Sequence, residues 1–298
     1  MKIANAPCSW GVLEFGMEGE IAGYETVLDE IRLTGYSGTE LGDWGFMPVD
    51  PEQLHKELGK RSLQLVGAFV PVNYLSDDDY QAGKVSALKT ARLLRDSGHP
   101  TAQLVLSDDN GKNETRTRYA GRIQPSHGLN RADRKRFGER VNELAKIVRD
   151  ETGIGSTFHH HCAGFVETPD EIAALLDLTA PELVSLCFDT GHFAFGGGDP
   201  VQGLKTFADR IGHVHFKDWD QSIYRKTVAD NLDYFEAVGL GIFCELGKGI
   251  IDFEAILREL KSQNYSGWIV VEQDILPGMG TPKESALRNR EFLRRAGL

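Results

Sequence analysis

The stretch "STFHHHCAGFVETPDEIAALLDLTAPELVSLCFDTGH", residues 156–192, runs from one β-rich segment through a helical segment to a second β-rich segment. Residues 156–162 and 183–190 are short runs typical of strands, and apolar residues recur near helical spacing between them. A strand, a helix and a second strand in succession form a βαβ unit, whose two strands are parallel. This stretch therefore predicts an α/β fold.

The same alternation continues from one end of the chain to the other. Strand-like runs occupy residues 2–10, 38–42, 63–71, 101–108, 156–162, 183–190, 211–218 and 267–274. Amphipathic segments such as "YETVLDEIRLTG" and "FEAILRELKSQ" separate them. Eight strands with about eight helices in 298 residues predict a (β/α)8 TIM barrel formed as a single domain over residues 1–298.

Composition and charge restrict the partners that we expect. The formal net charge of −11 repels the phosphate backbone, so we expect no nucleic-acid partner, and we interpret the basic stretch 116–136 as solvated. No apolar run approaches the roughly 20 residues of a membrane helix, and the first residues lack a signal-peptide core. Four cysteines far apart indicate a cytoplasmic protein. A small molecule is the expected partner, and the sequence leaves homo-oligomerisation open.

Polar residues cluster where the predicted strands end, which is where barrel enzymes place their active sites. The candidates are Glu40 in "GTELG", Asp189 and His192 in "CFDTGH", His213, His215 and Lys217 in "HVHFKD", and Glu272 in "VVEQD". Charged groups do not converge in a dry core unless they are paired or bound to a metal. Because carboxylates and an imidazole would meet at one rim, they predict a divalent cation site of mixed oxygen and nitrogen ligation.

Three consecutive histidines lie within the fifth predicted strand, residues 156–162. Because side chains alternate along a strand, His159 and His161 should face the mouth of the barrel, while His160 should point toward the helices. His160 would then need a hydrogen-bond partner and would take no part in the chemistry. The triplet therefore supplies two candidate site residues.

Four motifs stand out along the chain: "NAPCSWGVLEF" (5–15), "LCFDTGHFAFGGGDP" (186–200), "IGHVHFKD" (211–218) and "GWIVVEQD" (267–274). They resemble motifs of the sugar-isomerase-type barrels that include xylose isomerase and endonuclease IV, and most closely those of the inosose (2-keto-myo-inositol) dehydratases of inositol catabolism. The resemblance spans nearly the whole chain. It implies a metal held by a Glu, an Asp, a His and a Glu on the last four strands, and it places Asp189, His215 and Glu272 at the last three of these positions.

The chain departs from this pattern at the first ligand, because "TFHHHC" has Phe158–His159 where the relatives have Phe-Glu. We expect His159 to take the ligand position. Glu167 in "FVETP" is the serious alternative, if it folds back to supply the missing carboxylate. In a third arrangement, three protein ligands and additional water hold the metal.

The resemblance also implies a reaction, the loss of water from 2-keto-myo-inositol to give a trihydroxycyclohexane-dione through an enediolate. Glu167 or a histidine of the fifth strand would take the α-proton, and His161, His192 or Lys217 would protonate the departing hydroxyl. Mn²⁺ or Co²⁺ is the favoured cofactor, with Mg²⁺ or Zn²⁺ as alternatives. Other readings are a keto-sugar isomerase or epimerase, an endonuclease IV-type nuclease, and a polyol-binding barrel without catalysis.

Further residues are candidates for substrate contact. The aromatic residues Trp10, Phe15, Trp44 and Phe46 follow the first two strands and would pack against a cyclitol ring, although packing under loops explains them equally well. Arg116, Arg118 and Arg122 lie in the long connection after the fourth strand and would reach over the mouth. Among all these residues we select Trp10, Glu40, Trp44, Arg122 and His213 as substrate-binding.

Overall fold

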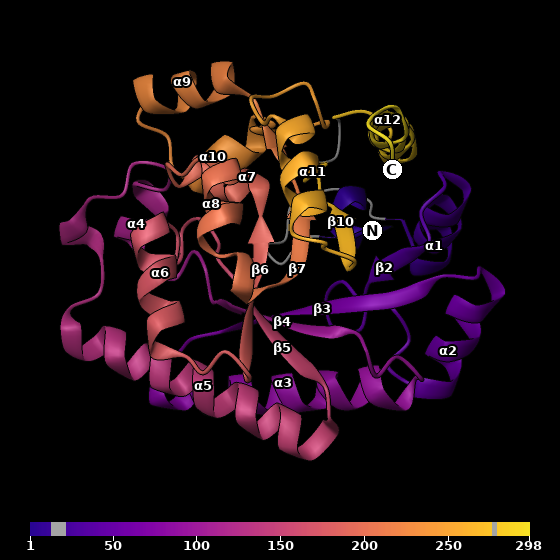
Figure 1. Cartoon of the computed structure of the whole chain (residues 1–298), viewed down its shortest axis with the longest axis horizontal. Coiled ribbons are helices and arrows are strands. Elements are labelled where there is room, and N and C mark those ends of the chain that lie inside the picture. The colour runs from indigo at the N-terminus through magenta and orange to yellow at the C-terminus, as the bar shows by residue number, and fades with distance from the viewer. Residues whose placement is uncertain (13–21, 276–278) are drawn as a thin grey trace.

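A closed barrel of eight parallel strands forms the centre of the computed structural model (Figure 1), which describes residues 1–12, 22–275 and 279–298. Around the barrel the strands follow the order β1-β10-β7-β6-β5-β4-β3-β2. Their bounds are β1 Lys2–Asn5, β2 Gly38–Glu40, β3 Gln64–Val72, β4 Gln103–Asp108, β5 Gly155–His159, β6 Val184–Asp189, β7 Ile211–Phe216 and β10 Trp268–Val271. This architecture confirms the predicted (β/α)8 TIM barrel.

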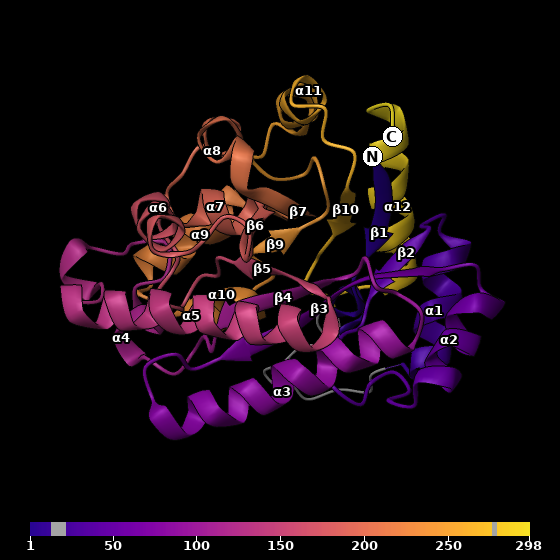
Figure 2. The ribbon, with the colours of Figure 1, turned by 60° about the horizontal axis from the view of Figure 1, so that its bottom comes forward.

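Helices surround the barrel and cover its outer face (Figures 1 and 2). The α-helices are α1 Tyr24–Leu33, α2 Pro51–Lys60, α3 Asp77–Asp96, α4 Glu114–Arg118, α5 Arg131–Thr152, α6 Pro169–Leu178, α7 Thr190–Phe195, α8 Pro200–Thr206, α9 Gln221–Ala229, α10 Tyr234–Gly239, α11 Phe253–Ser262 and α12 Pro282–Arg295. Short 3₁₀ helices span Pro7–Trp10, Pro125–His127 and Ala208–Arg210. Within the described ranges, no helix is long and apolar enough to cross a membrane.

Local sequence explains where the helix of the opening stretch begins. Thr168 and Glu171 form a reciprocal capping box at the start of α6, with Pro169 at the first helical position. Ile172, Leu175 and Leu176 are buried. The spacing of these three residues puts them on one face, which packs into the core, so sequence and packing favour the same helix.

The first strand is shorter than the sequence suggested. We expected a strand over residues 2–10, but β1 ends at Asn5 and residues Pro7–Trp10 form a 3₁₀ helix. Pro7 lacks an N–H for the strand ladder and its fixed φ suits the first position of a helix. The expected strand 267–274 ends at Val271, so Glu272 follows it directly.

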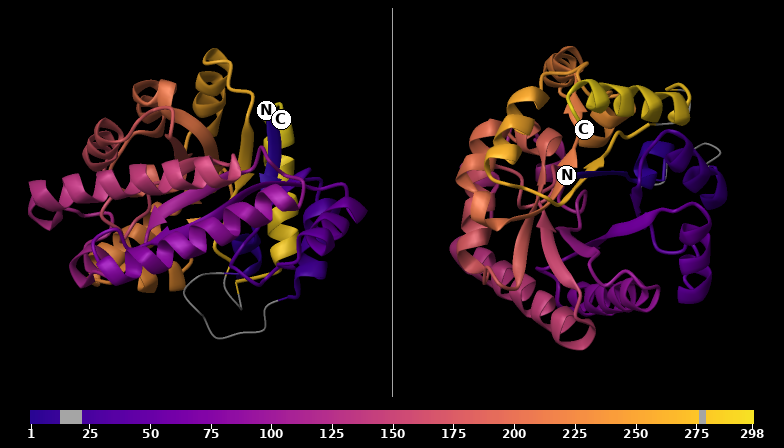
Figure 3. Two further views of the ribbon diagram at one scale, coloured as in Figure 1. Left: turned by 90° about the horizontal axis from the view of Figure 1, so that it is seen from below. Right: turned by 45° about the vertical axis from the view of Figure 1, so that its right-hand side comes forward.

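The two long connections also contain structure that the sequence did not indicate. A small antiparallel sheet pairs β8 (Asp218–Trp219) with β9 (Phe243–Cys244) after the seventh barrel strand. The preceding long connection, residues 109–130, contains α4 and a 3₁₀ helix. The chain closes on itself because β1 pairs with β10, which leaves the two termini close together in each view (Figure 3).

Candidate metal centre at the carboxyl ends of the strands

Four side chains with metal-binding atoms meet where β5, β6, β7 and β10 end. His159 ends β5, Asp189 ends β6, His215 lies one residue before the end of β7, and Glu272 follows β10. One ligand atom from each lies within 4.8 Å of the others. His159 Nε2 is 3.7 Å from Asp189 Oδ2, and the same oxygen is 3.8 Å from His215 Nδ1. We call these four residues the carboxylate set.

The carboxylate set contains buried atoms without hydrogen-bond partners that an added ligand would satisfy. Among the described residues, neither Asp189 Oδ2 nor His215 Nδ1 has a hydrogen-bond partner, and both are buried. Glu272 Oε1 lies 3.2 Å from the same His215 nitrogen. Buried polar atoms are seldom left unpaired in proteins. A cation bound between these atoms would satisfy them together, so the residues present fit a divalent metal ion.

Burial and neighbouring charges set the protonation of the carboxylate set. Burial lowers the pKa of His159 to about 3, so its imidazole is neutral and has a lone pair for a metal. Burial also raises the pKa of Asp189. At Glu272 burial opposes ionisation, but the charges of His215 and Lys217 outweigh it and hold the pKa of the carboxyl well below its usual range. Although burial opposes its charge, neighbouring acidic groups raise the pKa of His215 well above its usual value, so a bound metal would displace a proton from this ring.

Glu40, at the end of β2, fixes the orientation of the His215 ring through the ring nitrogen that faces away from Asp189 and Glu272. Its Oε1 accepts hydrogen bonds from His213 Nε2 at 2.7 Å and from His215 Nε2 at 3.0 Å. With Nε2 occupied in this way, the Nδ1 atom of His215 is left to face Asp189 and Glu272. A carboxylate that holds the second nitrogen of a histidine is a common support for a metal ligand. The structure thus assigns Glu40 and His213 this supporting contact.

The histidine triplet divides as strand alternation predicts, although β5 ends at His159. His159 and His161 line a cavity at the mouth of the barrel. His160 is buried against Phe188 and Phe193, and its Nε2 accepts a hydrogen bond from the Asp189 backbone N–H at 3.2 Å. His160 thereby anchors the strand end that presents Asp189.

Glu167 lies away from the carboxylate set, in a buried cluster of its own. Its carboxylate accepts backbone hydrogen bonds from Gly121 N at 2.6 Å and Ala163 N at 3.0 Å, and Arg116 Nη2 lies 4.0 Å away. Burial raises the pKa of Glu167 to about 7. The structure groups His159, and not Glu167, with Asp189, His215 and Glu272. In this arrangement the atoms of His159, the expected fourth ligand, lie with the other three, whereas those of the alternative, Glu167, do not.

Residues 28–296 match the family model described as Xylose isomerase-like TIM barrel. The chain belongs to this family. Inosose dehydratase 2 of Bacillus cereus (strain ZK / E33L) is 30% identical over 302 residues, which cover all of this chain and 98% of the relative. Matches of this kind to curated inosose dehydratases confirm the expectation that the chain is an enzyme of the hydro-lyase class.

Solved structures of other barrels share the fold at low sequence identity. The probable 3-DHS dehydratase AsbF of Bacillus anthracis superposes with a TM-score of 0.71 at 14% identity, covering 99% of each chain. The IOLI protein, whose structure holds a zinc atom, gives the same TM-score at 15% identity and covers 99% of this chain and 98% of that one. At these identities, the likeness extends to the fold alone.

The cavity of this family member contains a buried lysine that links several polar groups. Lys217 Nζ lies 3.1 Å from Glu272 Oε2, 3.4 Å from Asp274 Oδ1 and 3.4 Å from His192 Nε2. Although burial opposes its charge, Asp274 and Glu272 raise the pKa of Lys217 well above its usual value. His192 itself is fully buried beneath the lining, with its ring centroid 3.9 Å from that of His161. Lys217 and His161 are therefore the predicted catalytic groups that face the cavity.

Several residues that line the cavity were not singled out from the sequence, among them the polar residues Asp274, Asn110 and Tyr234. Asp274 follows Glu272 by two residues in "VVEQD", and this period of two would have indicated that it faces the same way. Asn110 and Tyr234 lie in the long connections after β4 and β7, where only the folded chain brings them to the mouth.

Glu40 lines the cavity and His213 contacts Glu40 from deeper in the barrel, whereas the other three predicted substrate contacts lie elsewhere and have other partners. Trp10 is buried, and its indole N–H donates to Glu30 Oε2 at 2.8 Å. Trp44 is 42% exposed, and Lys89 Nζ lies 4.3 Å from the centre of its ring. Arg122 donates to the backbone oxygen of Leu232 at 2.9 Å, which ties the two long connections together. None of the three is among the described residues that line the cavity, and Phe15 lies outside the described residues.

Proposed function

We propose that this protein is a metal-dependent dehydratase of a keto-cyclitol, which converts 2-keto-myo-inositol into a trihydroxycyclohexane-dione. The observation that carries the proposal is the carboxylate set, whose buried unpaired atoms face one another beside a cavity lined by proton-transfer groups. The full-length likeness to inosose dehydratases supports this substrate class. A small ring that carries hydroxyl groups suits a cavity whose lining combines apolar side chains with charged groups.

His159, Asp189, His215 and Glu272 would hold the cation. Two imidazoles with two carboxylates suit Mn²⁺ or Co²⁺, and they also accept Zn²⁺ or Mg²⁺. When bound, the cation supplies positive charge that stabilises the enediolate formed as the α-proton leaves. Glu40 would keep His215 in the orientation that this binding requires.

His161 is suited to remove the α-proton. Its Nδ1 lies 2.7 Å from the backbone oxygen of Cys162 and donates to it, which leaves the lone pair on Nε2. Burial lowers the pKa of His161 to about 3 in the empty site, so the ring is neutral but a weak base there; negative charge developing on the adjacent enediolate would raise its basicity as the α-proton leaves. A neutral imidazole that faces the cavity can accept a proton from carbon.

Lys217 is suited to assist the departing hydroxyl. Its ion pairs with Glu272 and Asp274 keep it protonated inside the cavity. Proton transfer from Nζ to the β-hydroxyl would release water as the carbon–oxygen bond breaks, while His161 holds the proton taken from the α-carbon. Lys217 Nζ is also within hydrogen-bonding distance of His192 Nε2, and this buried contact helps to hold Lys217 in position.

The test is turnover of 2-keto-myo-inositol by the purified protein, with the dione detected by its ultraviolet absorbance and by mass spectrometry. We expect activity to disappear after removal of metal by a chelator and to return with Mn²⁺ or Co²⁺. Unchanged activity in metal-free protein would refute the metal requirement. Re-equilibration of ketose stereoisomers without loss of water would identify an epimerase, and binding of inosose without any turnover would identify a polyol-binding barrel.

We also propose a cytoplasmic location for the enzyme. Cys8, Cys162, Cys187 and Cys244 are all free thiols, and a reducing compartment maintains them in this form. Cell fractionation with an antibody against the native protein tests the proposal. Recovery of the protein in a secreted or periplasmic fraction would contradict it.

A further inference from the structure

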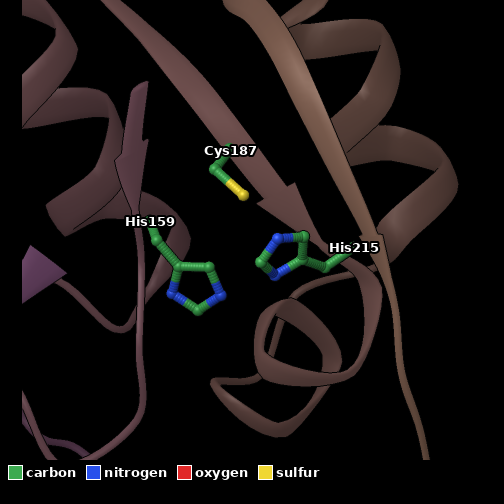
Figure 4. A group of neighbouring side chains, drawn as sticks. All are labelled: His159, Cys187 and His215. Atoms are coloured by element: carbon green, nitrogen blue, oxygen red, sulfur yellow. The ribbon is translucent and has the colours of Figure 1, made fainter. Parts of the chain in front are cut away.

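Cys187 lies immediately below the carboxylate set, on the inner face of β6. It precedes Asp189 by two residues, so both side chains point into the barrel. In the strand register Cys187 is the partner of His159 on β5 and of His213 on β7. Its side chain is fully buried. Figure 4 shows its sulfur directed into the gap between the rings of His159 and His215.

The thiol completes a second group of metal-binding atoms. The sulfur of Cys187 and one nitrogen each from His159 and His215 lie within 4.8 Å of one another. Both imidazoles are almost completely buried, and within the described ranges the Nδ1 atom of each has no hydrogen-bond partner. We call these three residues the sulfur set. It offers two nitrogens and one sulfur, whereas the carboxylate set offers two nitrogens and two oxygens.

We propose that the sulfur set binds a thiophilic divalent cation, such as Zn²⁺ or Cd²⁺, in competition with the ion of the carboxylate set. Thiolate ligands select soft ions, whereas Mn²⁺ and Mg²⁺ prefer oxygen. Both sets use His159 and His215, so a soft ion held by the sulfur set occupies the imidazoles that the other ion needs. The inference depends on the proposed function in one respect, which is that the catalytic ion would use the same two histidines.

Ion binding at the sulfur set involves no change in oxidation state. The S–H bond of Cys187 breaks, a sulfur–metal bond forms, and the proton passes to solvent through the cavity that His159 borders. Both imidazoles must be unprotonated to bind the ion. Binding therefore releases the thiol proton together with any proton carried by His215, and it needs no oxidant or other reactant.

The experiment titrates Cd²⁺ alone into the full-length protein after its metal has been removed with a chelator. We expect the ultraviolet thiolate-to-cadmium charge-transfer band to saturate at one equivalent of Cd²⁺. The band should be absent in Cys187→Ser and retained in Cys244→Ser, a control thiol in the small β8–β9 sheet. No band in the unmodified protein, or a band that persists in Cys187→Ser, would overturn the proposal.

Two further measurements separate a ligand from a residue that only supports the fold. Cys187→Ser should weaken Cd²⁺ binding by about tenfold or more but leave Mn²⁺ binding, followed by electron paramagnetic resonance, unchanged. An equal loss for both ions would contradict a ligand role. Asp189→Asn should lose Mn²⁺ binding and turnover yet keep the cadmium band, so failure of the dehydratase proposal and failure of the sulfur set are distinguishable.

Discussion

Two buried groups of charged side chains lie near the mouth of the barrel, and they differ in how their atoms are satisfied. In the first, Arg116 donates to both carboxylate oxygens of Glu171 at 2.7 and 2.8 Å and to Gly164 O at 2.7 Å, while backbone N–H groups satisfy Glu167. In the second, the carboxylate set, Asp189 Oδ2 and His215 Nδ1 have no hydrogen-bond partner among the described residues. Fully paired charges hold loops in place, whereas unpaired buried atoms that face one another mark a place for a ligand.

The largest effect should follow from removal of a metal ligand. His215→Ala and Glu272→Gln should each lower kcat/KM by about a thousandfold or more, because the metal contributes several kcal/mol to the transition state. Both variants should keep the circular dichroism spectrum of the parent and lose Mn²⁺ in calorimetric titrations. Normal Mn²⁺ affinity in either variant would remove that residue from the carboxylate set.

Breaking the paired group should instead reduce stability. Arg116→Met leaves Glu171 and Glu167 without their buried cation, which should lower the free energy of unfolding by about 3–5 kcal/mol. Denaturant unfolding measures this change, with the more exposed Arg118→Met as the matched control. We expect Mn²⁺ affinity to be retained in the folded variant. If Arg116→Met lost Mn²⁺ binding but kept normal stability, the paired group would have a role in metal binding and not in stability, contrary to the comparison.

The pH dependence of stability tests the role of Glu167. Burial raises the pKa of Glu167 from the ordinary 4.5 to about 7, so the unfolded chain releases this proton at lower pH than the folded protein does. The contribution of Glu167 to stability should therefore fall as pH rises from about 4.5 to 7 and then level off. Glu167→Gln should lack this component in unfolding experiments across the window. A variant without turnover at neutral pH would instead show that Glu167 acts in the reaction.

The smallest expected effect is a change in metal preference when the imidazole of His159 is replaced by a carboxylate. His159→Glu introduces at this position the carboxylate that the family resemblance implies, so it adds negative charge and an oxygen ligand. The ratio of Mn²⁺ to Zn²⁺ affinity should rise about tenfold, which corresponds to roughly 1.4 kcal/mol. His127→Glu adds the same charge in the connection after β4 and should leave the ratio unchanged. An unchanged ratio in His159→Glu would place His159 outside the ligand set.

Much of the fold and part of the site could be predicted from the sequence because they depend on local patterns. Alternation of strand and helix patterns predicted the closed barrel, and the period of two in "HVHFKD" placed His213 and His215 on one inner face. The predictions for Trp10, Trp44 and Arg122 rested on their position near strand ends. That position does not determine which neighbour a long side chain contacts, and each residue found a partner in another element.

By itself, the sequence determined that strands and helices alternate, that the polar residues follow the strands, and that a histidine stands at the fifth-strand position. Only the tertiary structure decided between His159 and Glu167 as the neighbour of Asp189, His215 and Glu272. It also revealed that Cys187 faces the same two imidazoles. The physical reason is that residue spacing along one strand determines direction, whereas barrel closure and strand register determine which atoms from different strands come within bonding distance.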